Sequence, residues 1–256
     1  MIFRLSKFTV LVLLLQMLAS CAPTNRLLKS RPVALSPFFE QPQYAVDARK
    51  YLPFQKTWTT PNSAVLKAGV AARRLYIAPV TLAYLRPLKR TIARREAEWG
   101  LQRQEHAVAA RLREEFIAAF RASPAPVYRI VDRPGPGVAT LHLAITELNP
   151  TCPKGNAAVT LLKVALTPVA GLAGHFTKGN MAIEGKVRGQ GPHAGTFFQF
   201  ADNEGDPLTI VNMRDYQPYG HAVNSMRRWA MQFEQMTRSP AGMRLKDSNA
   251  LLLRLN

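Results

Sequence analysis

Apolar positions repeat with the period of a helix in two stretches of the chain. Between residues 102 and 122, apolar side chains recur at about every fourth position and charged side chains occupy the opposite face, which is typical of an amphipathic helix. The stripe that we expect to face the core consists of Val108, Ala109, Leu112, Phe116, Ala119 and Phe120. A second stripe, within residues 219–237, consists of Ala222, Met226, Trp229, Ala230, Phe233 and Met236. The pattern therefore predicts two helices, each burying one face.

Other stretches alternate apolar and polar residues with the period of two that a strand requires. The clearest is residues 138–148, where we expect one side of the strand to be apolar and the other to carry Thr140, His142 and Thr146. Further strands are predicted at residues 74–84, 127–131, 181–187 and 196–201. A Pro/Gly turn at 133–137 follows the second of these, and a glycine-rich turn at 188–195 joins the last two into a hairpin.

The elements together predict an α/β fold of the α+β type, in which two amphipathic helices pack on a small mixed or antiparallel sheet. Pro79 lies inside the first predicted strand and has no N–H to give to a ladder, so we expect this strand at a sheet edge or with a bulge. The apolar stretch 157–174 is broken by proline and glycine. It fits either a strand with a loop or a helical hairpin, either packed in the core or in contact with a membrane.

The flanks of this region have a different character. Residues 21–70 contain six prolines and no sustained periodicity, so we expect an extended tether with a short ordered stretch near residues 44–54. The globular domain is predicted to span residues 71–238. Residues 239–256 form a basic C-terminal tail for which the pattern predicts no structure.

The first 20 residues have the layout of a secretory signal peptide. Arg4 and Lys7 precede an apolar run at residues 8–15, which is far shorter than the roughly 20 residues that span a bilayer. The residues that follow resemble a lipoprotein signal, whose lipobox would be Leu18, Ala19, Ser20 and Cys21. We therefore expect cleavage before Cys21 and acyl chains such as palmitate attached through its thiol. Because Ala22 is unlike the aspartate of inner-membrane retention signals, the expected location is the periplasmic face of the outer membrane.

The balance of charge suggests what the surface attracts. The chain has 34 Lys and Arg against 16 Asp and Glu, a formal net charge of +18, and such an excess concentrates anions near the surface. The export signal argues against nucleic acid as a partner, which leaves anionic lipid, lipopolysaccharide and peptidoglycan. The residues that could contact such an anion or a partner are Arg86, Lys89, Arg90, Arg94 and Arg95. The alternative is that they form a solvated helix face.

The sequence contains few features that indicate catalysis. The five histidines are scattered, and no H-E-x-x-H, G-x-S-x-G or Walker-type motif occurs. Asp215, His221 and Ser225 are the nearest approach to an acid, base and hydroxyl set, at a spacing that is common by chance. We therefore expect no catalytic residue, no metal site and no cofactor. If Cys21 is lipidated, Cys152 has no partner for a disulfide within the chain.

Two smaller features have ordinary interpretations beside functional ones. Glu184 lies near Lys186 and Arg188 on a predicted strand, so we expect it to be half of a surface ion pair. The glycines between residues 189 and 195 could form an anion-holding nest, but a simple turn explains them as well.

Several segments resemble a family of uncharacterised bacterial lipoproteins known as a domain of unknown function, DUF3313. The resemblance covers about residues 70–238 together with the lipobox. It is carried by the segments 133–146 (RPGPGVATLHLAIT), 166–179, 181–190 (MAIEGKVRGQ), 219–222 (YGHA) and 228–230 (RWA). The turn at 189–195 (GQGPHAG) departs from the acidic turn that is usual in the family, so any binding by that turn is in doubt here. The resemblance implies a location and a fold, and no reaction.

These observations leave three hypotheses about function. The first is a non-catalytic binding or envelope-assembly lipoprotein that is anchored to a membrane and recognises an envelope protein, for example by strand addition at an exposed sheet edge. The second is a basic surface protein that binds an anionic envelope polymer, either lipopolysaccharide or peptidoglycan. The third is a hydrolase whose site the sequence does not reveal.

Overall fold

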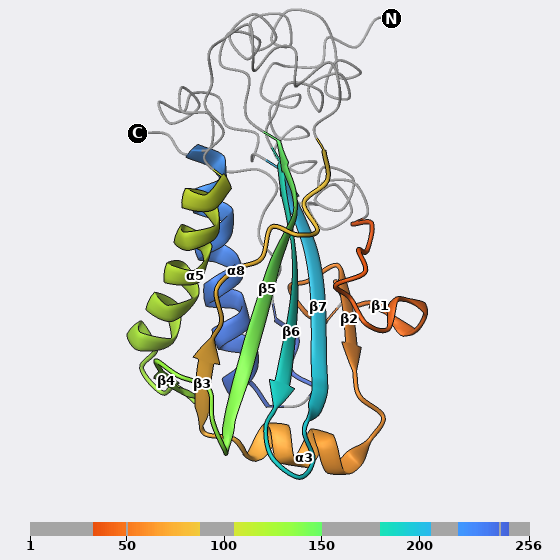
Figure 1. The fold of residues 1–256 in the computed structure, drawn as a ribbon, viewed down its shortest axis with the longest axis vertical. Helices are drawn as coiled ribbons and strands as arrows, with labels where there is room; N and C mark the ends of the chain where they lie inside the picture. Colours follow the sequence, from red (N-terminus) through yellow and green to blue (C-terminus); the bar gives the residue numbers. More distant parts are fainter. Residues whose placement is uncertain are drawn as a thin grey trace, which may run out of the picture.

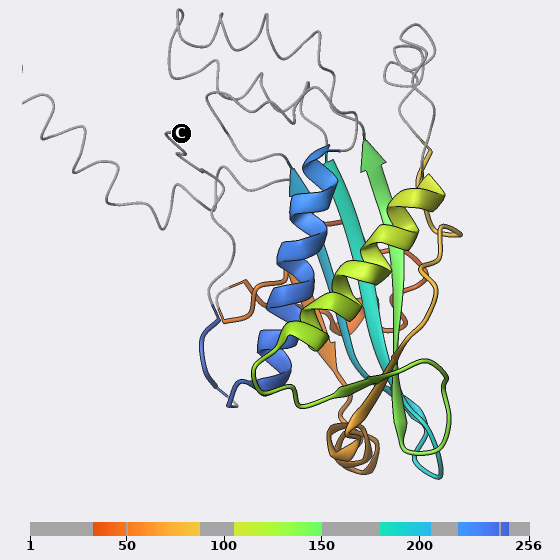
Figure 2. The same cartoon turned by 90° about the vertical axis from the view of Figure 1, so that its left-hand side faces the viewer.

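The protein is described by a computed structural model that covers residues 33–49, 51–87, 105–149, 180–205, 220–240 and 242–245. In these residues seven strands form one mixed sheet in the order β1-β2-β7-β6-β5-β3-β4. Two long helices, α5 and α8, lie side by side across one face of the sheet (Figures 1 and 2). This arrangement confirms the predicted α+β fold.

The elements follow the chain in a simple order. A 3-10 helix η1 and strands β1 and β2 come first, then helix α3, strand β3, helix α5, strands β4 to β7 and helix α8. Their bounds are η1 Pro42–Tyr44, β1 Val46–Asp47, β2 Lys56–Thr59, α3 Ser63–Ala71, β3 Arg74–Ile77, α5 Glu105–Ala122, β4 Arg129–Val131, β5 Val138–Asn149, β6 Asn180–Gly189, β7 Gly195–Gly205 and α8 Gly220–Arg238. Both predicted helices and the predicted hairpin of β6 and β7 are confirmed.

The three longest strands form the centre of the sheet. β5, β6 and β7 pair antiparallel in sequence, β2 adds antiparallel to β7, and β3 and β4 add parallel on the other side of β5. The expected edge position of the proline-bearing strand is therefore wrong, because β3 pairs with β5 on one side and β4 on the other. The other expected alternative, a bulge, fits the structure: pairing with β5 passes from Ile77 opposite Leu141 to Thr81 opposite Ala144, so four steps along the segment that contains Pro79 match three along β5. Thr81 donates its N–H to the carbonyl of Leu143, so backbone bonding resumes after Pro79, which has no N–H to give. In the described residues the edge strands are β1 and β4.

The core lies between the sheet and the two helices. The expected apolar stripes are buried there, with Ala119 and Met236 only partly covered. Aromatic rings form its centre: Phe233 of α8 lies 5.1 Å from Phe200 of β7, 5.9 Å from Phe116 of α5 and 6.5 Å from Phe54, measured between ring centroids. Aromatic pairs at such separations add to the burial of apolar area that drives the helices onto the sheet.

The expected tether is the largest difference from the structure. From residue 33 onward the described part of that segment packs into the domain: Val33 and Phe39 are buried against the sheet, β2 is one of its strands, and α3 packs at its end. Of the described prolines, Pro42 begins η1 and the others lie between elements; Pro61, for example, precedes Asn62, whose side chain caps α3 by accepting from the backbone of Ala64 and Val65. The folded domain therefore begins at or before residue 33 and not at residue 71.

The region after α8 also belongs in part to the domain. Leu245 is buried, and its N–H donates to the carbonyl of Tyr51 over 2.9 Å. Within the described residues, no helix combines the length and apolar character that crossing a bilayer requires. The stretch 157–174 and the first 20 residues lie outside the described residues.

Candidate functional site

The face of the sheet opposite the helices is polar and partly covered. The first described residues, 33–40, lie across it, and we call them the cover segment. The amide N–H groups of this segment donate to sheet side chains, from Ser36 to Glu184 and from Glu40 to Gln199. Apolar contacts of Val33 and Phe39 with Ala182 and Ala201 accompany these bonds. Polar strand residues that would otherwise meet water are therefore partly enclosed.

Glu184 is the most deeply buried acid of this face. Its side chain is 0% exposed, and Ser36 donates its N–H to Oε1 at 2.6 Å and its hydroxyl to Oε2 at 2.7 Å. Burial raises the pKa of Glu184, against the opposing effect of these hydrogen bonds and of Arg86 and Lys186. The expected surface ion pair is therefore wrong, because the cover segment removes this carboxyl from solvent and satisfies it with hydrogen bonds.

Lys186 contacts the C-terminal end of the cover segment, at Phe38 and Glu40. Its Nζ lies 2.9 Å from Oε1 of Glu40 and 4.4 Å from the ring centroid of Phe38. Burial tends to raise the pKa of Glu40, but the hydrogen bonds of Lys186 and Thr196 and the charges of Lys186 and Arg188 together outweigh it, so the pKa is lowered. Glu40 is therefore a carboxylate that the sheet holds in its ionised form.

His142 is the histidine nearest to these groups. It pairs with Lys186 across β5 and β6, is half-buried, and has its pKa lowered first by burial and then by the charges of Lys186 and Arg188. Neighbouring Thr140 is 3% exposed, and its Oγ1 has no hydrogen-bond partner among the described residues. The described side chains of this face hold the cover segment through Glu184, Gln199 and Lys186.

The acid, base and hydroxyl set considered from the sequence is not assembled in the described residues. Ser225 is a buried residue of α8, and its hydroxyl accepts a hydrogen bond from Nη2 of Arg228 at 3.0 Å. Asp215 lies outside the described residues, and the side chain of His221 is not among those described. No group of three or more His, Cys, Asp or Glu side chains that could hold a metal occurs in the part of the chain that the structure describes.

Two buried acids of β7, Asp202 and Glu204, bond to residues of α8. The sequence pattern did not point to either of them. Asp202 accepts from Nε1 of Trp229 at 2.8 Å and lies 3.3 Å from Nη2 of Arg49, while Glu204 forms an ion pair with Arg228. The alternating pattern of β7 gives no sign that these acids face the helices. These bonds position α8 and connect it to the segment after β1.

The basic residues proposed as anion contacts are only partly described. Arg86 donates to the carbonyl of Ala34 and lies 4.0 Å from a carboxylate oxygen of Glu147. Its side chain therefore helps to hold the chain near the cover segment. Lys89, Arg90, Arg94 and Arg95 lie outside the described residues, as do Leu18, Ala19, Ser20, Cys21 and Cys152.

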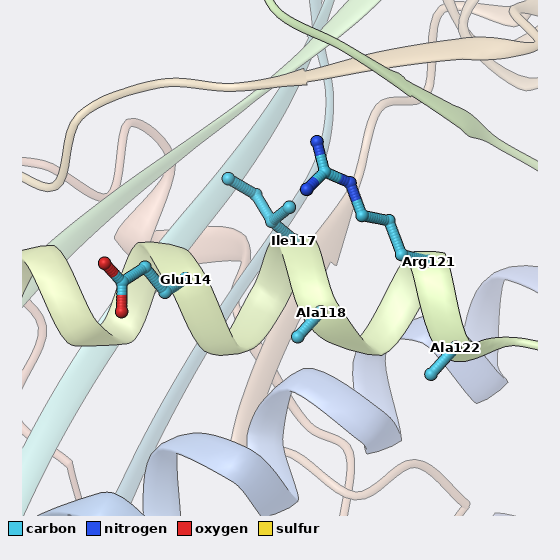
Figure 3. Close-up of a pocket in the computed structure, with 5 residues that line it drawn as sticks. All are labelled: Glu114, Ile117, Ala118, Arg121 and Ala122. Carbon is cyan, nitrogen blue, oxygen red and sulfur yellow. The ribbon is translucent and has the colours of Figure 1, made fainter.

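A hollow on the surface of α5 carries no convergent chemistry. It has a volume of about 530 Å³ and is lined by Glu114, Ile117, Ala118, Arg121 and Ala122 (Figure 3). Its two charged residues, Glu114 and Arg121, come from one helix and are attached well apart along it in the figure, with Ile117 and Ala118 between them. Ligand sites are usually enclosed and combine polar groups from several elements, which this hollow does not.

The edge at β1 is the part of the described surface that exposes large apolar side chains together. Tyr44 is 64% exposed, Val46 59% and Tyr51 55%, and the hydrogen bond from Leu245 to Tyr51 brings the segment of the exposed Met243 beside them. We call these four residues the β1 edge surface; β1 itself lies at one edge of the sheet in Figure 1. Among the described strands β1 pairs only with β2, so its other side is an open strand edge.

Comparison with known proteins identifies the family. A family model described as a protein of unknown function (DUF3313) matches residues 61–190, from the residue before the cap of α3 to the residue after β6. No curated protein matches the chain. The matched region contains the segments 133–146 and 181–190 that carried the resemblance, whereas those in α8 lie outside it. Because the match spans half of the sequence, the chain belongs to the DUF3313 family, whose function is unknown.

Proposed function

We propose that this protein is a non-catalytic binding lipoprotein of a bacterial cell envelope, which docks a protein partner on the β1 edge surface. The observation that carries the proposal is the exposure of Tyr44, Val46 and Tyr51 at an open strand edge. The charge of Asp47 and the nearby Pro42 protect this edge in part, as is usual in natural proteins, so the proposal rests on the exposed apolar side chains beside it, which are typical of interaction sites.

Side chains would contribute most of the affinity at this surface. β1 has only two residues, so an added strand would gain few backbone hydrogen bonds from it. Tyrosine is among the residues that most often dominate interface energies, because it buries a large rigid area and keeps a polar group at its tip. The partner would therefore present an apolar groove or strand into which Tyr44 and Tyr51 fit.

The proposed location rests on the beginning of the sequence. The short positive region, the apolar run and the lipobox that ends at Cys21 support export and lipid attachment. The residue after the cysteine favours the outer membrane. Several acyl chains on one residue give a stable anchor, whereas a single chain binds only reversibly.

A photo-crosslinking experiment tests the docking surface. A photoreactive residue at Val46 is compared with one at Met231, which is equally exposed at 59% but lies on α8. In intact cells we expect an adduct of defined mass from position 46 and not from position 231. The adduct should persist at about half-molar salt, because apolar contacts are little affected by ionic screening.

A second variant makes the result specific. We expect Tyr44→Ser combined with Tyr51→Ser to reduce the adduct from position 46 about tenfold, which corresponds to about 1.4 kcal/mol of binding. The proposal is wrong if position 46 gives no adduct, if both positions give the same adducts, or if the tyrosine substitutions leave the yield unchanged.

A further inference from the structure

Three arginines project from the polar face of the sheet, from strands β3 and β4 and from the end of β6 beyond Lys186, which contacts the cover segment. Arg74 of β3 and Arg129 of β4 are direct partners in the ladder, and Arg188 of β6 pairs with Thr140 of β5. The residues beside them, Leu75, Ile130 and Val187, pack in the core. Because side chains alternate along a strand, the three arginines face the opposite side. We call them the arginine row.

The arginine row is not neutralised by neighbouring acids. All three side chains are exposed, and within the described residues none forms an ion pair. Glu40 forms its ion pair with Lys186, and the charge of Arg188 contributes to its lowered pKa without an ion pair between the two side chains. The segments 63–76, 127–140 and 186–196, which supply the strand ends and turns here, contain a single acid, Asp132. An exposed positive patch without counter-charges attracts anions.

Two details indicate that the patch is suited to oxyanions. Nη2 of Arg74 donates to the carbonyl of Pro136 at 2.9 Å, which restricts the movement of that side chain and leaves other N–H groups of its guanidinium group available. Thr140 lies between Tyr76 and Arg188 in the register, and its hydroxyl is a donor that no described residue uses. Guanidinium groups pair with phosphate or carboxylate through two parallel hydrogen bonds, so arginine suits these anions better than lysine does.

The spacing of the row favours an extended ligand. Arg129 and Arg188 are separated by three strand spacings, roughly 14 Å at about 4.8 Å each. One small anion cannot bridge that distance, whereas successive charged groups of a polymer can. A membrane surface is less well matched, because interfacial binding also needs apolar side chains that insert. Of the exposed large apolar residues described, only Val70 lies on a segment that borders the row.

We propose that Arg74, Arg129 and Arg188 form a binding site for an extended polymer that carries repeated phosphate or carboxylate groups. The site is independent of the proposed partner surface, since it lies toward the β4 side of the sheet and the β1 edge surface lies at the other edge. The two proposals can therefore fail separately. This site also differs from the stretch around Arg86, whose side chain is engaged within the fold.

A binding experiment with defined probes tests the site. The full chain carries Cys21→Ala so that no thiol-linked lipid adds its own affinity, and the probes are linear polyphosphate, inorganic phosphate and phosphatidylglycerol vesicles. Arg129→Gln with Arg188→Gln is compared with Arg121→Gln and Arg244→Gln. Both pairs remove two positive charges, and none of the four side chains has an ion pair in the described residues.

We expect polyphosphate to bind and the Arg129 and Arg188 pair to weaken it by roughly tenfold or more, while the control pair changes it less than about twofold. Circular dichroism of all variants should coincide with that of the parent. The proposal is overturned if polyphosphate does not bind or if both pairs weaken it equally, which would reflect net charge alone. It is also overturned if inorganic phosphate binds as tightly as the polymer, or if only vesicle binding depends on Arg129 and Arg188.

Discussion

The environment of Glu184 depends on a contact between two distant parts of the chain, strand β6 and the cover segment. Its carboxyl is shut off from water by the cover segment and receives two hydrogen bonds from Ser36, but no cation lies within ion-pair distance in the described residues. Burial places its pKa above the ordinary value of 4.5. The folded state therefore holds this proton more tightly than the unfolded chain does. The contribution to stability is full below pH 4.5 and is lost as the pH rises through the higher pKa of the folded state.

The substitution Glu184→Gln tests this account. The amide can accept from the N–H of Ser36 and donate to its hydroxyl, so both contacts can be kept without a buried charge. Relative to the parent, we expect the variant to gain on the order of 1 kcal/mol in free energy of unfolding between about pH 5 and about pH 8. Urea denaturation at the two pH values measures the difference. Glu114→Gln, on an exposed side chain, is the control and should show no such gain. A relative loss of stability toward high pH would show that the carboxylate is favoured by the fold.

At the scale of elements, a helix or strand could be predicted from sequence where its hydrophobic period was long and regular. Helices α5 and α8 each repeat one period over their full length, and strand β5 alternates regularly up to Ile145, where its register with β6 shifts, so the position and core face of these elements are evident from sequence. β2 and α3 have only 4 and 9 residues and lie among prolines, where no period can be recognised. The edge position predicted for β3 was wrong for a related reason. A proline indicates where a strand is interrupted, as at Pro79, and it gives no information about which strands pair beside it.

The packing of β7 against β6 depends on the absence of a side chain at Gly185. A Cβ there would lie 2.2 Å from the ring of Phe200, which packs against Phe54 and Phe233 in the core. We expect Gly185→Ala to lower the free energy of unfolding by about 1–3 kcal/mol, because a central ring must leave its position. Gly135→Ala is a matched control, since a Cβ there meets nothing within 4 Å. Equal midpoints for the two variants in chemical denaturation would contradict the close packing of these strands.

At the scale of the whole molecule, the candidate surfaces are assembled from parts that are far apart in the sequence. The excess of positive charge was evident from composition, and it was assigned to the dense stretch from Arg86 to Arg95. The arginine row instead takes one residue from each of three strands, and only the order β6-β5-β3-β4 brings these together. The β1 edge surface likewise needs the pairing of a two-residue strand. Such sites have no local pattern, so the sequence could indicate the kind of partner but not the residues.

The proposed lipid anchor would determine which partners the surfaces of the molecule can reach. Its presence can be tested on the whole protein. If Cys21 is lipidated, mass spectrometry of the native protein should find an N-terminal fragment that begins at this residue and carries acyl chains. Cys21→Ala should then move the protein from the membrane to a soluble fraction, because each buried methylene of the lost chains contributes about 0.8 kcal/mol. The buried clusters begin at Val33, so we expect an unchanged thermal midpoint for the variant. Substituting Ser20 with Ala, which keeps a small residue before the cysteine, is the control and should leave the protein in the membrane fraction. An unmodified thiol in native protein would remove the anchor from the proposed function, whereas the arginine row and the β1 edge surface would still stand on their own contacts.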